Sequence, residues 1–171
     1  MNKDFKIIAK HILNKYDVFD IERKENKDRE SFSHLGWMLE KIVNSNLQDT
    51  KMARWFGYVL AILVVKSIDK EEVFFDFDNL TLKTDKDFIN SHIIAGQHYL
   101  ENNLLNTDFP NINNKLIEYK CKERLSEVLS DKYDSVESNV VFGYIQGHLV
   151  HLNLLNVEDE RNRTRSIFNG E

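Results

Sequence analysis

The feature that most restricts the fold of this sequence is the run from Arg54 to Val65, which is apolar apart from its first residue. A helix that is apolar on nearly every face must be surrounded by other elements or buried in a subunit interface. The run is too short to cross a bilayer, which needs about 20 apolar residues. We therefore expect a buried core helix around which the rest of the chain packs.

Part of this run is repeated 86 positions further along the chain, where Phe-Gly-Tyr at residues 56–58 recurs at residues 142–144. Both copies keep a small residue four positions after the glycine, Ala61 in the first and Gly147 in the second. Small residues at this spacing flatten one face of a helix, so that another helix can approach closely. Chance similarity between two apolar helices is the alternative. The pattern predicts a duplicated helical unit with pseudo-two-fold symmetry.

Residues that interrupt helices are rare, since the chain has one proline and six glycines. This favours helices over the turn-rich pattern of an all-β fold. We interpret residues 69–84 as a short helix and an irregular link, although short strands fit them equally well. Hydrophobic periodicity and capping residues predict a compact all-α bundle of six or seven helices in a single domain, 1–171, with halves 1–84 and 85–171. The main helices are expected over residues 4–16, 29–46, 50–67, 85–103, 110–132, 135 to 153–156, and 157–168.

The net charge of −5 argues against bulk binding of nucleic acid, although it leaves room for a local basic pocket. Cys121 is the only cysteine, so the chain cannot form an internal disulfide and a reducing compartment is expected. The first residues have the charges but not the long apolar region of a signal peptide. We therefore expect a cytoplasmic protein that does not enter a membrane. We also expect a homo-oligomer, since the apolar helix can form a subunit interface.

Three segments of the chain, at residues 34–38, 54–58 and 143–149, resemble parts of small phage-encoded proteins of unassigned function. These proteins carry a helix of the form Arg-Trp-x-Gly-aromatic-x-Gln-Gly-x-Leu after a helix with a His-x-x-Trp-Met-like pattern. Here residues 34–38 and 54–58 match the first helix and the front of the motif, and residues 143–149 match its back. Val140-Val141 replace Arg-Trp in the second copy and Leu60-Ala61 replace Gln-Gly in the first, so a composite site would be asymmetric. The resemblance covers about a third of the chain and implies a phage accessory protein acting in the host cytoplasm.

Arg54 stands at the start of the most apolar helix, where a charge is costly unless it is paired or exposed. A buried salt bridge and a solvated helix end are the structural explanations. The functional explanation is a guanidinium that recognises an anion, with Trp55 or Tyr58 offering a flat surface for a base. The second central helix is also unusually polar for a core helix, and it could line a ligand pocket. The predicted ligand-binding set is Arg54, Trp55, Tyr58, Tyr144, Gln146, His148, His151, Arg161 and Arg165.

The arginines near the carboxyl end, Arg161 and Arg165, follow an acidic segment. This order complements a helix dipole and needs no function, yet the arginines could close over an anionic ligand. His148 and His151 lie three residues apart, so a metal site with His34 and a carboxylate is geometrically possible. The paired Glu-x-x-His motifs of di-iron bundles are absent from the sequence, and we expect no metal and no cofactor.

No complete catalytic motif occurs in the sequence. We therefore expect a non-enzymatic phage accessory protein that binds and neutralises a host factor. This partner is either a defence protein or a small anionic nucleotide signal. The alternatives are a metal-dependent helical-bundle hydrolase using His34, His148 and His151, and a purely structural oligomer.

Overall fold

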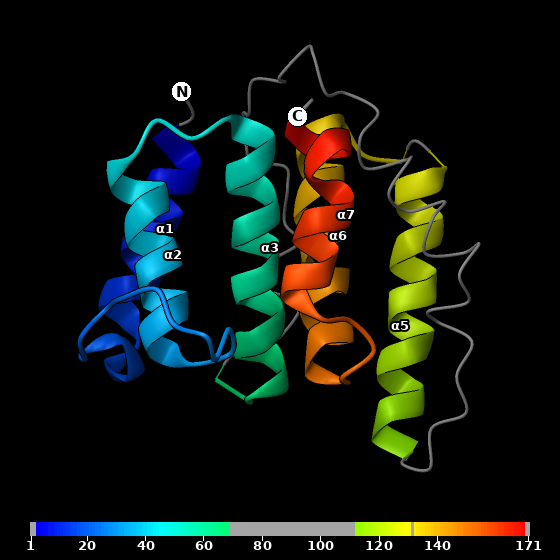
Figure 1. Ribbon diagram of the computed structural model, residues 1–171, viewed down its shortest axis with the longest axis horizontal. Helices are drawn as coiled ribbons and strands as arrows, with labels where there is room; N and C mark the ends of the chain where they lie inside the picture. The colour runs from blue at the N-terminus through cyan, green and yellow to red at the C-terminus, as the bar shows by residue number, and fades with distance from the viewer. Residues whose placement is uncertain (1–2, 69–111, 131, 170–171) are drawn as a thin grey trace.

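The computed structural model describes residues 3–68, 112–130 and 132–169, and every regular element in these ranges is a helix (Figure 1). No strand occurs in these ranges, so the expected all-α class is confirmed. The expected helix at 85–103 and the uncertain segment 69–84 lie outside the described residues. Within the described part, no helix has the length and apolar character needed to cross a membrane. The elements are α1 (Lys3–Lys15), a 3₁₀ helix (Asp17–Phe19), α2 (Phe32–Asn44), α3 (Asp49–Val65), α5 (Ile112–Leu129), α6 (Ser135–His151) and α7 (Val157–Asn169).

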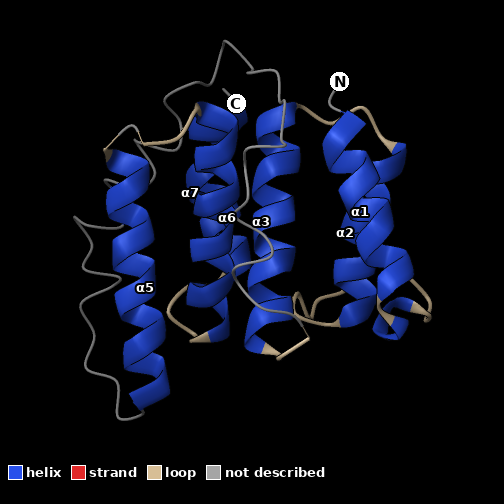
Figure 2. Cartoon of the chain, turned by 180° about the vertical axis from the view of Figure 1, so that it is seen from behind, coloured by secondary structure: helices blue, strands red, loops and turns tan. Residues whose placement is uncertain are grey.

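Helices α3 and α6 lie side by side at the centre and run in the same direction (Figure 1). Helices α1 and α2 pack on the α3 side, whereas α5 packs on the α6 side (Figures 1 and 2). Phe5 of α1 meets Phe56 of α3 with ring centroids 5.3 Å apart. The expected central position of the two apolar helices is therefore confirmed.

Glycines allow α3 and α6 to touch backbone to backbone. A Cβ atom added to Gly57 would lie 1.9 Å from the carbonyl oxygen of Val140, and one added to Gly143 would lie 2.0 Å from that of Arg54. A Cβ on Gly147 would meet the Cβ of Ala61 at 2.6 Å. No side chain larger than hydrogen fits at these glycines without separating the helices.

The contacts between α3 and α6 exchange under the 86-residue shift. Gly57 faces Val140, and the residues equivalent to these two, Gly143 and Arg54, also face each other. Ala61 faces Gly147, which is its own equivalent. Reciprocal contacts of this kind are the mark of a two-fold axis. The two helices therefore pack with pseudo-two-fold symmetry about an axis that runs along the pair.

The carboxyl ends of α3 and α6 repeat the same backbone turn. Ser67 and Asn153, 86 residues apart, both have a φ of 57°. At the end of α3, the N–H of Ser67 donates to Val64 O at 3.0 Å and the N–H of Ile68 donates to Leu63 O at 2.8 Å. At the end of α6, the equivalent bonds from Asn153 to Val150 and from Leu154 to Leu149 measure 3.0 and 2.9 Å. This is the Schellman arrangement, in which a left-handed residue closes the helix. The two helices also have identical bounds after the shift.

Capping residues explain where the observed bounds differ from the expected ones. Helix α2 begins at Phe32 rather than residue 29, because the Ser31 hydroxyl accepts the N–H of His34 at 3.3 Å and so fixes the first turn. The expected cap of α3 by Asp49 or Thr50 is wrong, since Gln48 occupies the cap position and its side chain makes no cap bond.

The cap of α6 agrees with one of the two residues expected. Asp134 accepts the N–H groups of Val136 and Glu137, and the Glu137 carboxylate accepts the N–H of Asp134 at 3.0 Å. This reciprocal pair is a capping box. The helix then runs to His151, a few residues short of the expected end at 153–156, because Asn153 takes the left-handed conformation.

Candidate functional site

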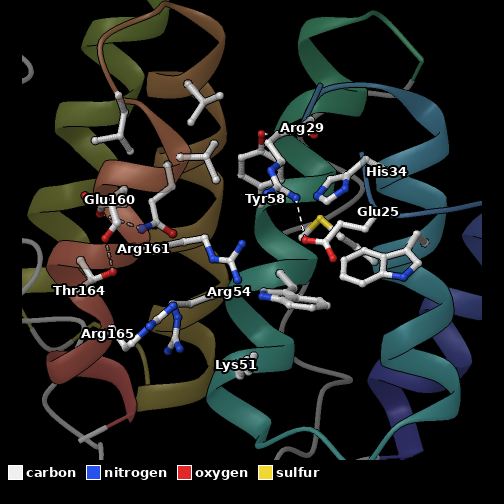
Figure 3. Close-up of a pocket in the computed structure, with 17 residues that line it drawn as sticks. Glu25, Arg29, His34, Lys51, Arg54, Tyr58, Glu160, Arg161, Thr164 and Arg165 are labelled. Carbon is white, nitrogen blue, oxygen red and sulfur yellow. Dashed lines mark hydrogen bonds and ion pairs between the residues drawn. The ribbon is translucent and has the colours of Figure 1, made fainter. Parts of the chain in front are cut away.

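A pocket of about 470 Å³ lies between α2 and α3 on one side and α6 and α7 on the other (Figure 3). Its volume suits a small organic ligand, since such pockets usually measure some 300–1,000 Å³. The segment before α2 contributes two further side chains to the lining. The lining side chains are Glu25, Arg29, His34, Trp37, Met38, Lys51, Arg54, Trp55, Tyr58, Gln146, Val150, Leu155, Val157, Glu160, Arg161, Thr164 and Arg165.

Positive charge dominates this pocket although the chain as a whole is acidic. Five arginine and lysine side chains but only two carboxylates line it, whereas the net charge of the chain is −5. Arg161 and Arg165 are four residues apart on α7 and so share one face, and in Figure 3 both lie close to Arg54 of α3. The guanidinium groups of two helices thus converge on one place, as an anion-binding site requires.

Arg54 is held in position by α6. It is 8% exposed, and its Nη1 donates to Oδ1 of Asn139 at 2.8 Å. The Asn139 amide is itself oriented, because its Nδ2 donates to the carbonyl oxygen of Ser135 at 2.6 Å. Burial lowers the pKa of Arg54 to about 9, which still leaves the guanidinium protonated at neutral pH. A preorganised, desolvated cation therefore forms part of the pocket wall.

Aromatic rings form the wall contributed by α2 and α3. The ring of His34 stacks on Trp37 at a centroid distance of 5.3 Å, and Trp37 meets Trp55 at 5.6 Å. Tyr58 extends this wall, and burial raises the pKa of its phenol, so the hydroxyl stays protonated. Aromatic faces of this kind can stack on any planar heterocycle, whichever base it is.

The two carboxylates of the pocket are bound to cationic or amide groups of the protein. Glu25 accepts from Arg29 at 3.0 Å, and Arg29 also pairs with Glu158 of α7. Glu160, whose side chain is 6% exposed, accepts from Gln146 at 3.0 Å and pairs with Arg163. These bonds attach α7 to α6 and to the segment before α2.

The structure brings six of the nine predicted ligand-binding residues into the pocket lining: Arg54, Trp55, Tyr58, Gln146, Arg161 and Arg165. The other three lie outside it. Tyr144 and His148 pack against each other edge to face at 4.5 Å, and both are buried. His151 bonds through Nδ1 to the Glu30 carboxylate at 2.9 Å on the surface. Fewer of the predicted α6 residues therefore face the pocket than the sequence indicated.

Several pocket residues were missed by sequence reasoning. Lys51 precedes Arg54, Trp55 and Tyr58 at helical spacing, so the face that these three share could have included it. Glu25 and Arg29 lie in a charged segment without periodicity, which gave no indication of its position beside α2.

The histidines of the alternative hydrolase do not come together. His34 accepts the backbone N–H of Asn26 at 3.1 Å, whereas His148 and His151 make the separate contacts given above. Nowhere in residues 3–68, 112–130 and 132–169 do three His, Cys, Asp or Glu side chains cluster in a way that could hold a metal ion.

No protein-family model, curated protein or solved structure matches this chain. The resemblance to small phage proteins, the host target and the homo-oligomer therefore stay predictions. The pocket itself is the basis for any statement about function.

Proposed function

We propose that this protein is a non-catalytic binding protein that takes up a small anionic ligand of the nucleotide class. The observation that carries this proposal is the pocket in which guanidinium groups from α3 and α7 face an aromatic wall from α2 and α3. Nucleotides combine a phosphate with a planar base, and these two walls match the two parts.

The polar groups of the pocket favour binding over catalysis. The two carboxylates are bonded to arginine side chains, and the Thr164 hydroxyl donates to the carbonyl oxygen of Glu160 at 2.7 Å. Nδ1 of His34 accepts a backbone N–H, so this ring has no free basic nitrogen. The half-exposed Glu25 keeps lone pairs for a ligand, whereas the other groups named here are already engaged, as expected of a binding site and not of a general base or an activated nucleophile.

The biological role that fits this activity is sequestration. The resemblance to small phage proteins supports a setting in the cytoplasm of an infected host, where binding would withdraw a nucleotide signal from its receptor. A protein that only binds must be present in amounts comparable to its ligand, because it does not turn over.

Isothermal titration calorimetry with inorganic pyrophosphate, ribonucleoside monophosphates and the uncharged nucleosides tests this proposal. We expect binding of the phosphates and monophosphates and weaker or no binding of the nucleosides. Arg165→Gln should weaken binding about tenfold, as expected for one charge-assisted hydrogen bond. The matched control is Lys10→Gln on α1, which removes an exposed positive charge away from the pocket. Failure of every phosphate compound to bind, or equal loss in both variants, would contradict the proposal.

A further inference from the structure

His34 presents a fixed hydrogen-bond donor to the pocket. Its Nδ1 accepts the N–H of Asn26 at 3.1 Å, so in the neutral ring the proton resides on Nε2. Burial, assisted by the nearby charge of Arg29, lowers the pKa of His34 to about 4, and the ring is therefore neutral at pH 7. Because this ring lines the pocket and stacks on Trp37, a heterocycle beside the tryptophan meets an N–H donor.

Glu25 presents an acceptor on the same side of the pocket. Its carboxylate is about half exposed and its contact with Arg29 uses Oε1, which leaves capacity for further donors because an ionised carboxylate offers about four lone-pair sites. Figure 3 shows Glu25 and His34 on the α2 side, whereas Arg161 and Arg165 lie on α7 across the pocket. The α7 side of the pocket therefore carries Arg161 and Arg165 with Glu160, whereas the other side carries the Glu25 carboxylate, its partner Arg29 and the neutral N–H of His34.

Few planar heterocycles complement both groups. Guanine carries two adjacent N–H donors on one edge and the acceptors O6 and N7 on the next. The two donors match a carboxylate and the acceptors match an N–H. Adenine has an unprotonated ring nitrogen beside its amino group, and this lone pair would face the negative charge of Glu25.

We propose that the pocket selects guanine nucleotides, with the N–H edge of guanine on Glu25, its acceptor edge on His34, and the phosphate on Arg54, Arg161 and Arg165. This inference rests on the proposed nucleotide binding and adds the identity of the base. The rings of Trp37 and Trp55 are already in contact, so the base does not lie between them.

Titrations with GMP, IMP, AMP and pyrophosphate separate this inference from the proposed function. GMP should bind at least about tenfold more tightly than AMP, because a site that hydrogen-bonds a substrate edge rejects analogues that leave its groups unpaired. IMP, which lacks the 2-amino group, should fall between them. Equal affinity for GMP and AMP would overturn the choice of base and leave nucleotide binding intact. Failure of all four to bind would overturn both.

Variants locate the discrimination on the named residues. Glu25→Gln should abolish the preference for GMP over AMP and leave the affinity for pyrophosphate unchanged. Glu22→Gln is the matched control, since Glu22 is exposed in the same segment, pairs with Lys24 and lies outside the pocket lining. His34→Phe keeps an aromatic ring against Trp37 and removes the hydrogen-bond donor. This variant should therefore also reduce the preference for GMP over AMP. A GMP preference that survives Glu25→Gln would show that this carboxylate does not read the base.

Discussion

Gly143 of α6 lies against the backbone of Arg54 of α3, with space at its α-carbon for hydrogen alone. The same residue whose backbone forms this contact sends its side chain into the pocket. The helix packing therefore determines where the buried guanidinium lies.

Gly143→Ala is expected to destabilise the protein by about 1–3 kcal/mol or more, because the added methyl overlaps a rigid backbone and forces the helices apart. Gly57→Ala should behave alike, given its matching contact with Val140. Gly36→Ala is the milder comparison, since its nearest neighbours, Cγ of Arg23 at 3.1 Å and Cδ1 of Phe19 at 3.3 Å, are side-chain atoms at longer distances and not backbone. Urea denaturation measures all three, and a neutral Gly143→Ala would contradict the close packing.

Substitution by glycine at the two helix ends should have the opposite effect. Ser67→Gly is expected to stabilise by up to about 1 kcal/mol, because serine is strained at a φ of 57° and glycine is not. Asn153→Gly should gain less, since asparagine tolerates the left-handed region better. Thermal unfolding of the two variants gives the comparison. A larger gain at Asn153 would argue against equivalent turns.

The pairing of Arg54 with Asn139 predicts non-additive mutations. Asn139→Leu is expected to cost about 2–3 kcal/mol, because it removes a hydrogen bond from a buried cation. Once Arg54→Met has removed the charge, the same change should cost less. A double-mutant cycle in urea checks this, and additive effects would show that the two side chains are not coupled.

The depressed pKa of His34 predicts a loss of stability in acid. The unfolded chain takes up a proton on this ring near its ordinary pKa of 6.5, whereas the folded protein does so only near 4. This contribution to stability is therefore complete above pH 6.5 and is lost as the pH falls towards 4. Unfolding curves between pH 4 and 7.5 measure it. His34→Gln should flatten this dependence, and an unchanged dependence in this variant would show that another group is responsible.

Fluorescence should report ligand binding directly, since both tryptophans of the chain line the pocket. A purine stacked on Trp37 or Trp55 is expected to quench their emission, and pyrophosphate should quench it less at saturation. Trp55→Phe would remove part of the response. Equal quenching by pyrophosphate and nucleotide would argue against stacking.

The fold could be predicted from local patterns because the apolar run at Arg54–Val65 and its repeat have few alternatives. The ends of the helices were harder to predict from the sequence. Gln48 occupies the cap position of α3 without a side-chain cap bond, so its sequence gives no sign of a helix start. Asp134 and Glu137, in contrast, form a capping box that can be recognised in the sequence at the start of α6.

The site was predictable on α3 because Arg54 is an exception within an apolar helix. The wall formed by α6 and α7 was harder to predict, because it depends on how α7 folds back against α6. Tyr144 and His148 are polar exceptions of the same kind, yet they face each other and not the pocket. Sequence identifies which residues are unusual, while packing decides which of them share a cavity.

The parallel course of α3 and α6 also affects how the chain folds. Parallel neighbours cannot be joined by a tight turn, and these two contact each other across 86 positions of sequence. During synthesis α3 leaves the ribosome well before α6. The apolar face of α3 therefore stays without its packing partner until α6 has been made. Such non-local contacts slow folding and expose partly folded chains to aggregation. Helices α3 and α6 are thus interdependent, and we expect that neither acquires its native packing before the other has been made.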